Sequence, residues 1–350
     1  MRNKFYLIIL MLIVGQLAFA GNPDRQGEAG ATQLLLNPWA RSAGLSLMNT
    51  SNISGVEALR LNVAGLVRSP SNTQVIAGFA RYLGSASLDI SLNGIGFAQK
   101  VGKNGAFGVS LMTVDFGEIP VTTTDLPDGN GSTFSPRFFN MAISYAHEFE
   151  NKVSVGVTAR VISEGLASVT ANGIAFDAGV QYVTGENDEF KFGISLRNVG
   201  TPLTYEGDGL SQSLSSPNPD VDQDLTFLTP ANQFEIPSLL NIGISYDFII
   251  NPMHRITVLG NFTSNTFYED QIGGGLEYVF NDILILRGGY KYELDTDDEV
   301  LPSVYSGLSF GASVQVPFNK EKGSNFGIDY AYRTTDVFEG THNLTLRFDI

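Results

Sequence analysis

Histidine and serine are the residues of this chain best suited to catalysis, but their spacing does not form a site. His147, His254 and His342 are far apart, and none belongs to a metal-binding pattern such as H-E-x-x-H. Ser144 lies three residues before His147, so in a strand the two side chains point to opposite faces. The chain has no Cys, which excludes thiol catalysis and thiolate metal ligands. We therefore expect no catalytic residue, no metal site and no cofactor, with His147 and His342 near a membrane interface.

Carboxylates gather in two segments, 200–237 and 294–302, that are rich in Pro, Gly, Ser and Asp. Such oxygens can bind Ca²⁺, but no EF-hand-like Gly and terminal Glu accompany them. We expect solvated acidic surfaces. The first segment also carries Phe227 and Leu228, which makes it a candidate partner-docking or lid segment, the alternative being a mobile surface loop. The acidic residues are Asp220, Asp222 and Asp224 in the first segment and Asp295, Asp297, Asp298 and Glu299 in the second.

Composition narrows the class of protein. The formal net charge of -15 argues against nucleic acid as a partner. Gly 38, Phe 24 and Tyr 13 are high counts, charged residues make up only 16%, and mean hydropathy is +0.04. After residue 20 no stretch approaches the roughly 20 apolar residues of a spanning helix. A membrane protein of this composition must use a β-barrel, in which only alternate residues are apolar.

Residues 1–20 form a predicted Sec signal peptide, which indicates export. Arg2 and Lys4 precede the apolar run Phe5–Ala20, and Ala18-Phe19-Ala20 fits the small-x-small cleavage pattern. Together with a barrel, this segment predicts location in the bacterial outer membrane.

Alternation of apolar and polar residues predicts the barrel itself. In the last strand, Gly340–Ile350, Leu344, Leu346 and Phe348 share one face, while the opposite face is polar. A barrel needs such a strand here, because its last strand pairs with its first. We predict an all-β fold, a transmembrane antiparallel β-barrel of about fourteen strands over residues 72–350. The predicted strands are 72–82, 85–99, 103–115, 136–149, 152–164, 170–183, 189–199, 238–249, 253–265, 270–280, 283–293, 303–316, 323–333 and 341–350.

Connection lengths support this topology independently. Connections that follow even-numbered strands are short and turn-like, whereas those after odd-numbered strands include the long segments 116–135, 200–237 and 294–302. This phase is typical of outer-membrane barrels, which have short periplasmic turns and long external loops. The least regular strand is 85–99, where alternation slips at Asn93-Gly94, so we expect either a bulge or a different strand count.

Residues 21–71 do not alternate. They hold the only Trp, Trp39, and short apolar pieces such as Leu34-Leu35-Leu36. We predict a partly helical N-terminal plug inside the barrel, the alternative being a periplasmic extension.

Two short stretches of this N-terminal segment resemble a known family. Asn37-Pro38-Trp39-Ala40-Arg41-Ser42-Ala43-Gly44 and Leu61-Asn62-Val63-Ala64-Gly65-Leu66 resemble the PorV/PorQ family of Bacteroidetes outer-membrane proteins, relatives of the FadL long-chain fatty-acid transporters. Leu45-Ser46 replaces the family's Met-Gly, and Leu61 and Val63 replace its Trp and Pro. The residues that match, and that the resemblance marks as a plug motif, are Ala40, Arg41, Ser42, Gly44, Asn62, Ala64, Gly65 and Leu66.

The resemblance implies a fourteen-stranded barrel with an N-terminal plug and a place in the type IX secretion system. The expected partners are then outer-membrane lipid, translocon or attachment-complex proteins, and secreted cargo. The alternative is a FadL-like transporter that carries a hydrophobic ligand, and a plain porin-like barrel is a third possibility. Small residues expected to face the lumen, Gly156, Gly243, Gly311 and Ala142, permit either a ligand path or close packing of a plug.

Overall fold

The computed structural model describes residues 25, 27–84, 90–150, 152–215, 224–294, 303–319 and 324–350. The predicted signal peptide, Asp220, Asp222 and the acidic group at 295–299 lie outside the described residues. No helix in the described ranges is long and apolar enough to cross a membrane.

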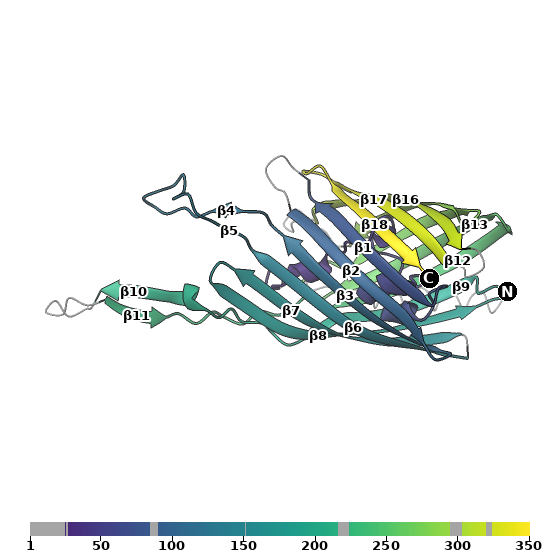
Figure 1. The fold of residues 1–350 in the computed structure, drawn as a ribbon, viewed down its shortest axis with the longest axis horizontal. Coiled ribbons are helices and arrows are strands. Elements are labelled where there is room, and N and C mark those ends of the chain that lie inside the picture. The colour runs from purple at the N-terminus through teal and green to yellow at the C-terminus, as the bar shows by residue number, and fades with distance from the viewer. Residues whose placement is uncertain are drawn as a thin grey trace.

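Fourteen strands form one closed antiparallel barrel (Figure 1). The predicted barrel and its strand count are therefore confirmed, and the strand ends lie within a few residues of the predictions. Residues 85–89, the predicted start of the second strand, lie outside the described residues. The strands are β1 (Thr73–Tyr82), β2 (Ile90–Val101), β3 (Gly105–Asp115), β6 (Arg137–Phe149), β7 (Val153–Leu166), β8 (Val169–Thr184), β9 (Phe190–Gly200), β12 (Leu239–Asn251), β13 (His254–Asn265), β14 (Gln271–Phe280), β15 (Leu284–Glu293), β16 (Tyr305–Asn319), β17 (Ser324–Thr335) and β18 (Thr341–Asp349).

The first and last strands close the barrel. β1 pairs with β18 from Gln74 opposite Asp349 to Arg81 opposite His342 without a break. Beyond the paired run, Thr73 and Ile350 exchange both backbone hydrogen bonds, at 2.9 and 2.8 Å. Closure removes the two sheet edges that would otherwise expose unpaired amides to hydrocarbon.

The irregularity expected at Asn93-Gly94 is absent. β2 pairs with β1 in unbroken register, from Thr73 opposite Gln99 to Tyr82 opposite Ile90. Gly94 breaks the apolar pattern because it faces inward against the N-terminal segment, where an added Cβ would lie 2.7 Å from Cγ of Pro38. A register shift occurs instead between β8 and β9, at Phe176 and Ala178.

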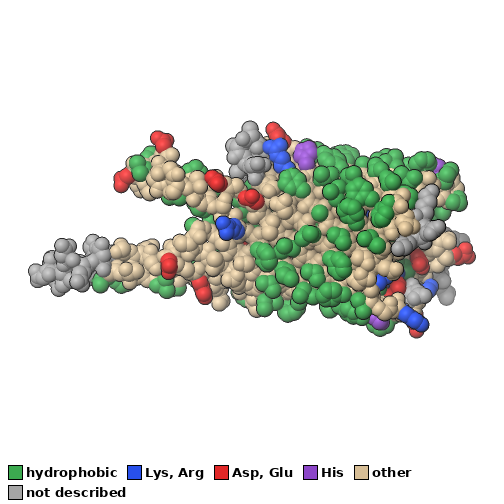
Figure 2. All heavy atoms as spheres, viewed as in Figure 1, with side chains coloured by type: hydrophobic (Ala, Val, Ile, Leu, Met, Phe, Trp, Pro, Cys, Tyr) green, Lys and Arg blue, Asp and Glu red, His purple; other side chains and the backbone are tan. Residues whose placement is uncertain are grey.

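The outer wall of the barrel is apolar. Side chains that alternate with buried ones along the strands are exposed, for example Val157, Ile244 and Phe310 at 57, 51 and 50%. Figure 2 shows hydrophobic side chains gathered over the barrel wall. A continuous exposed apolar band of this kind faces lipid, so the barrel spans a membrane.

Two of the long connections contain hairpins where the sequence predicts only irregular loops. β4 (Ile119–Pro120) pairs with β5 (Thr133–Phe134), and β10 (Ser211–Ser215), which follows η5 (Asp208–Leu210), pairs with β11 (Asp224–Leu228). Both hairpins extend beyond the same rim of the barrel (Figure 1). That rim is called the long-loop end here, and the opposite rim, which carries the short connections, the short-turn end.

The N-terminal segment lies inside the barrel and is partly helical. Its short helices are η2 (Thr32–Leu35), α2 (Ala40–Ala43), η3 (Gly55–Arg60) and η4 (Val63–Leu66). Leu34, Trp39 and Leu66 are fully buried. Ala31–Ser71 is called the plug below. Arg25 stays at the long-loop end, where it pairs with Glu235 at 3.3 Å.

The lipid-facing assignment predicts the effect of a charge on the outer wall. Replacing Ile244, in the middle of β12, with Arg should lower the free energy of unfolding by about 2–4 kcal/mol, because the guanidinium would enter hydrocarbon. Ile244→Leu should change it by less than about 0.5 kcal/mol. Denaturant titration in lipid vesicles, followed by heat-modifiable electrophoretic mobility, measures both variants. Equal stability of the two would contradict the assignment of faces.

Candidate functional site

Glycines on the inner wall let the plug backbone approach the strands closely. A Cβ added at Gly156 would lie 2.8 Å from the carbonyl carbon of Val63, and one added at Gly243 would lie 3.1 Å from the amide nitrogen of Ser51. At the third small position, the Cα of Gly311 lies 2.9 Å from the place of a Cβ on Gly44. Of the two uses expected for these residues, the structure has close packing of the plug. Ala142 also faces inward and is fully buried.

The first stretch of the plug motif attaches the plug to the closing strands. The amide of Ala40 donates to Thr345 Oγ1 at 2.9 Å, and Gly44 fits against β16. Ser42 donates to Glu57 Oε2 through both its amide, at 3.2 Å, and its hydroxyl, at 2.9 Å. These contacts explain small residues at three of the four positions.

The second stretch of the motif shapes the plug itself. The Asn62 side chain donates to the carbonyls of Thr50 and Val180, at 2.9 and 3.1 Å, and accepts from the Ala64 amide at 3.2 Å. A Cβ on Gly65 would lie 2.1 Å from the carbonyl oxygen of Ile53. Asn62 therefore ends one turn, begins the next and contacts β8.

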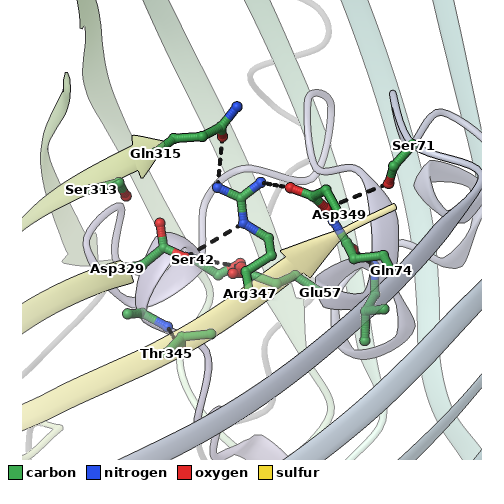
Figure 3. A network of polar contacts seen from close by, with 12 residues as sticks. Ser42, Glu57, Ser71, Gln74, Ser313, Gln315, Asp329, Thr345, Arg347 and Asp349 are labelled. Carbon is green, nitrogen blue, oxygen red and sulfur yellow. Dashed lines mark hydrogen bonds and ion pairs between the residues drawn. The ribbon is translucent and has the colours of Figure 1, made fainter. Parts of the chain in front are cut away.

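A polar network joins the plug to the barrel seam (Figure 3). Arg347 donates to Asp349 at 2.7 Å, and Asp349 also accepts from Gln74 at 2.6 Å. Gln74 accepts in turn from the amide of Val56 at 2.6 Å. Burial raises the pKa of the Glu57 carboxyl in the same region, and the opposing charge of Arg41 reduces that effect. The network links buried polar groups of the plug to those of β1 and β18, although Glu57 Oε1 and both carboxylate oxygens of Asp329 accept no hydrogen bond.

A second polar cluster lies across the lumen. Arg160 forms an ion pair with Asp177 and donates to Asn140 at 3.0 Å and to the carbonyl of Leu59 at 3.2 Å. Asp177 also accepts from the amide of Asn198 at 2.7 Å, at the register shift of β8 and β9. The ion pair lies within the wall, between β7 and β8, and the bond to Leu59 attaches the plug to it.

The lumen has an apolar region at the long-loop end, called the outer apolar cluster here. It combines inward-facing strand residues with plug residues and with Leu203 and Ile236 from the long connection after β9. Leu34 of the plug is fully buried within it. Its members are Ala31, Leu34, Ala80, Leu92, Met112, Val114, Phe138, Ile162, Ala171, Ala175, Leu203 and Ile236.

The base of the connection after β9 covers this cluster. Tyr205 packs on Phe234 with ring centroids 5.4 Å apart and donates to Glu164 at 2.8 Å. Burial, with the Glu164 carboxylate as neighbour, raises the pKa of Tyr205 to about 12. A bridge between Leu203 and Phe234 holds the two ends of the connection together.

The short-turn end of the lumen is polar. A cavity of about 290 Å³ lies there, between the plug and strands β8 to β14. It is called the inner vestibule below. Its lining includes Arg41, Ser51, Asn52, Ile53, Ser54, Arg68, Gln181, Val183, Asp188, Lys191, Asp247, Arg255, Thr257 and Glu277.

The candidate partner loop lies in the β10–β11 hairpin, away from the lumen. Phe227 and Leu228 are 47 and 68% exposed, and Asp224 begins β11. Asp220 and Asp222 fall outside the described residues. Within the part of the chain that the structure describes, no three His, Asp or Glu side chains are placed to hold a metal ion.

The histidines lie on the outer wall beside tyrosines. His254 Nδ1 and Tyr278 Oη are 2.7 Å apart, and His342 Nδ1 and Tyr330 Oη are 2.8 Å apart. His147 is 3.3 Å from Tyr145 Oη. This arrangement fits an interfacial aromatic belt. Ser144 is buried on the opposite face, as its parity predicts.

No protein-family model matches the chain, and no curated protein matches it. Several solved barrels are similar. A deletion mutant of the monoaromatic hydrocarbon channel TodX aligns with TM-score 0.56 and 14% identity, over 88% of this chain and 97% of that one. The Pseudomonas putida toluene transporter TodX gives 0.54 and 13%, over 89 and 97%. The Ralstonia pickettii toluene transporter TbuX gives 0.53 and 15%, over 89 and 97%.

The fold is that of these hydrocarbon-channel barrels. Identity is too low for these similarities to show more than the fold. Membership of the PorV/PorQ family and relationship to the FadL transporters both stay predictions.

Sequence reasoning missed both regions of the lumen. Phe138, Ile162 and Met112 are inward-facing apolar residues near the long-loop ends of their strands, where they interrupt the polar inner face. Two consecutive apolar residues in one strand, such as Phe138-Phe139, could have indicated that one of them faces the lumen. Lys191 and Arg255 come together only because the barrel closes, so no local pattern marks the inner vestibule.

Close packing of the plug against the inner-wall glycines predicts that a Gly→Ala substitution there lowers the stability of the protein. Gly156→Ala should lower the free energy of unfolding by about 1–3 kcal/mol, because its Cβ would overlap the backbone of Val63. Gly165→Ala on the same strand is the matched control, since its Cβ meets only Thr170 Cγ2 at 3.9 Å. Denaturant titration in lipid vesicles and protease sensitivity of the plug provide the readouts. A plug equally protected and equally stable in both variants would show that the lumen is looser than described.

Proposed function

We propose that this protein is an outer-membrane transporter for small hydrophobic molecules. The observation that carries the proposal is the outer apolar cluster. The lumen of a water-filled barrel is lined by polar residues, whereas this one contains buried apolar side chains such as Phe138 and Ile162. Apolar walls with few polar groups are the usual lining of sites for hydrophobic ligands. The similar solved structures are toluene transporters and a monoaromatic hydrocarbon channel, which supports the same class of ligand.

The plug occupies the place that such a ligand would take. Leu34 and Ala31 fill the centre of the cluster, with Leu36 packed at its edge. A ligand therefore enters by displacing η2, and the apolar contacts that it makes with the wall replace those of Leu34. The affinity of the ligand for the barrel is reduced by the free energy needed to move η2.

Passage beyond the cluster needs a larger movement. Below η2 the plug backbone lies against the strand glycines, and charged groups such as Arg160 tie it to the wall. A resting barrel of this kind is closed to solutes. Transport then depends on rearrangement of the plug, which is the step that limits its rate.

Truncation of Leu34 tests the proposal. Leu34→Ala opens a space lined by apolar side chains, and such cavities bind benzene-sized molecules. We expect the detergent-solubilised protein to bind toluene in a saturable way, and the variant to bind it at least fivefold more tightly. Headspace gas chromatography at equilibrium measures the bound fraction.

Leu45→Ala is the matched control, since Leu45 is equally buried in the plug but belongs to a separate cluster with Met48 and Leu259. It should bind toluene like the unmodified protein. Absence of saturable binding of toluene or dodecane by all three proteins would refute the transport proposal.

Attachment of partner proteins at the long-loop end is the second candidate, and it corresponds to the secretion role that the PorV/PorQ resemblance implies. The favouring observation is the pair of hairpins beyond the rim, whose connections 116–136 and 201–238 contain acidic residues and no Lys or Arg. The β10–β11 ribbon exposes Phe227 and Leu228. An isolated two-stranded ribbon is only marginally stable in water, so a bound partner would stabilise it.

A pull-down in mild detergent from native outer membranes tests the second candidate. Mass spectrometry should recover a large translocon barrel or secreted proteins with a shared C-terminal domain. Replacement of both Phe227 and Leu228 with Ser should reduce that recovery at least tenfold without affecting toluene binding. Recovery of the barrel with lipid alone would eliminate this function.

A further inference from the structure

The inner vestibule contains two arginines whose side chains have no hydrogen-bond partner among the described residues. Arg41 comes from α2 of the plug and Arg255 from β13, and both line the cavity. Neither guanidinium makes a hydrogen bond or ion pair with another described residue. The Nε of Arg255 is also buried from solvent. A guanidinium carries five N–H donors. Two guanidinium groups without hydrogen bonds beside one cavity therefore leave room for a ligand that accepts hydrogen bonds.

Carboxylates near these arginines interact with other residues, although Glu57 Oε1 and both oxygens of Asp329 accept no hydrogen bond. Glu277 Oε2 accepts from Arg287 Nε at 2.6 Å. Glu57 Oε2 accepts from Ser42 at 2.9 Å. Asp329 and Asp349 pair with Arg347, at 3.7 and 2.7 Å. All four carboxylates act on Arg41 through their charge, but none forms a hydrogen bond with it.

The other charged groups of the lining are paired as well. Lys191 lies 2.5 Å from Asp247, which also accepts from Thr257 at 2.7 Å. Arg68 pairs with Glu148 at 3.0 Å. The remaining carboxylate of the lining, Asp188, lies in the exposed turn between β8 and β9. Arg41 and Arg255 are therefore the enclosed charged side chains of the lining that form no direct pair with a described residue.

From this arrangement we infer a binding site for a carboxylate or phosphate group in the inner vestibule, with Arg41 and Arg255 as its ligands. Guanidinium matches the planar fork of a carboxylate and two oxygens of a phosphate, and such charge-assisted pairs are the strong ones. The volume of about 290 Å³ admits a head group or a small free anion with a few waters. Polar residues of the plug loop, Asn52 and Ser54, add further donors to the wall.

This site lies on the opposite side of the plug from the outer apolar cluster. Because Arg41 belongs to the plug and Arg255 to the wall, an anion bound by both connects the two. Occupancy of the site therefore favours the closed position of the plug. The site does not depend on the identity of the hydrophobic solute, and it stands if toluene does not bind.

Equilibrium dialysis of the full chain in a non-ionic detergent tests the inference, with radiolabelled orthophosphate and hexanoate as probes. At least one probe should bind in a saturable way, and the preferred probe identifies a phosphate or a carboxylate as the ligand group. Arg41→Gln and Arg255→Gln should each weaken that binding at least tenfold. Lys103→Gln, in the exposed turn between β2 and β3, removes a charge at the same rim outside the cavity and should change binding less than twofold.

A second measurement covers the case in which a variant fails to fold. Phenylglyoxal modifies accessible arginines. Mass spectrometry of the treated protein, without any substitution, follows the modification of Arg41 and Arg255 individually. The bound probe should slow modification of both at least threefold and leave Arg137 unaffected. Absence of saturable binding for both probes, or unchanged binding in both arginine variants, would overturn the site.

Discussion

Hydrocarbon offers no partner to a backbone amide, and this constraint determines the rest of the molecule. Every strand must pair on both sides, so β1 must meet β18, and the unbroken register from Gln74 to Arg81 achieves this. Once the wall is closed, alternate side chains point to lipid and to the lumen. The outer face becomes apolar, and the inner face encloses a space that the chain must either leave to water or fill.

This chain fills the space with its own N-terminal segment. Small inner-wall residues such as Gly156 and Gly243 bring the plug backbone against the strand backbone. Arg160 of β7 donates to the plug carbonyl of Leu59. The plug thus divides the lumen into an apolar half around Leu34 and a polar half around Arg41. An apolar solute and an anion would meet the same plug from opposite ends, which gives the two proposed sites a common mechanical element.

The barrel could be predicted from the sequence because each strand carries its own evidence in the alternation of residues such as Leu344, Leu346 and Phe348. The helical plug was predicted from the absence of alternation, and its motif residues only from a family resemblance. The β10–β11 hairpin escaped prediction because its strands have only five residues each, too few for a clear alternation. The inner vestibule escaped prediction because Lys191, Asp247 and Arg255 lie on three different strands. Contacts between strands that are distant in sequence form only when the barrel closes, and the periodicity of a single strand does not predict them.

The ionic conductance of single barrels in a planar lipid bilayer tests the central claim, that the plug closes the lumen. A fourteen-stranded wall with an empty interior would pass water and ions. With Gly44 against β16 and Asn62 against β8, the plug reaches the wall on both sides. The account predicts no steady current from the intact protein and a sustained current once residues 31–66 are deleted. A steady current from the intact protein, equal to that of the deletion variant, would contradict it.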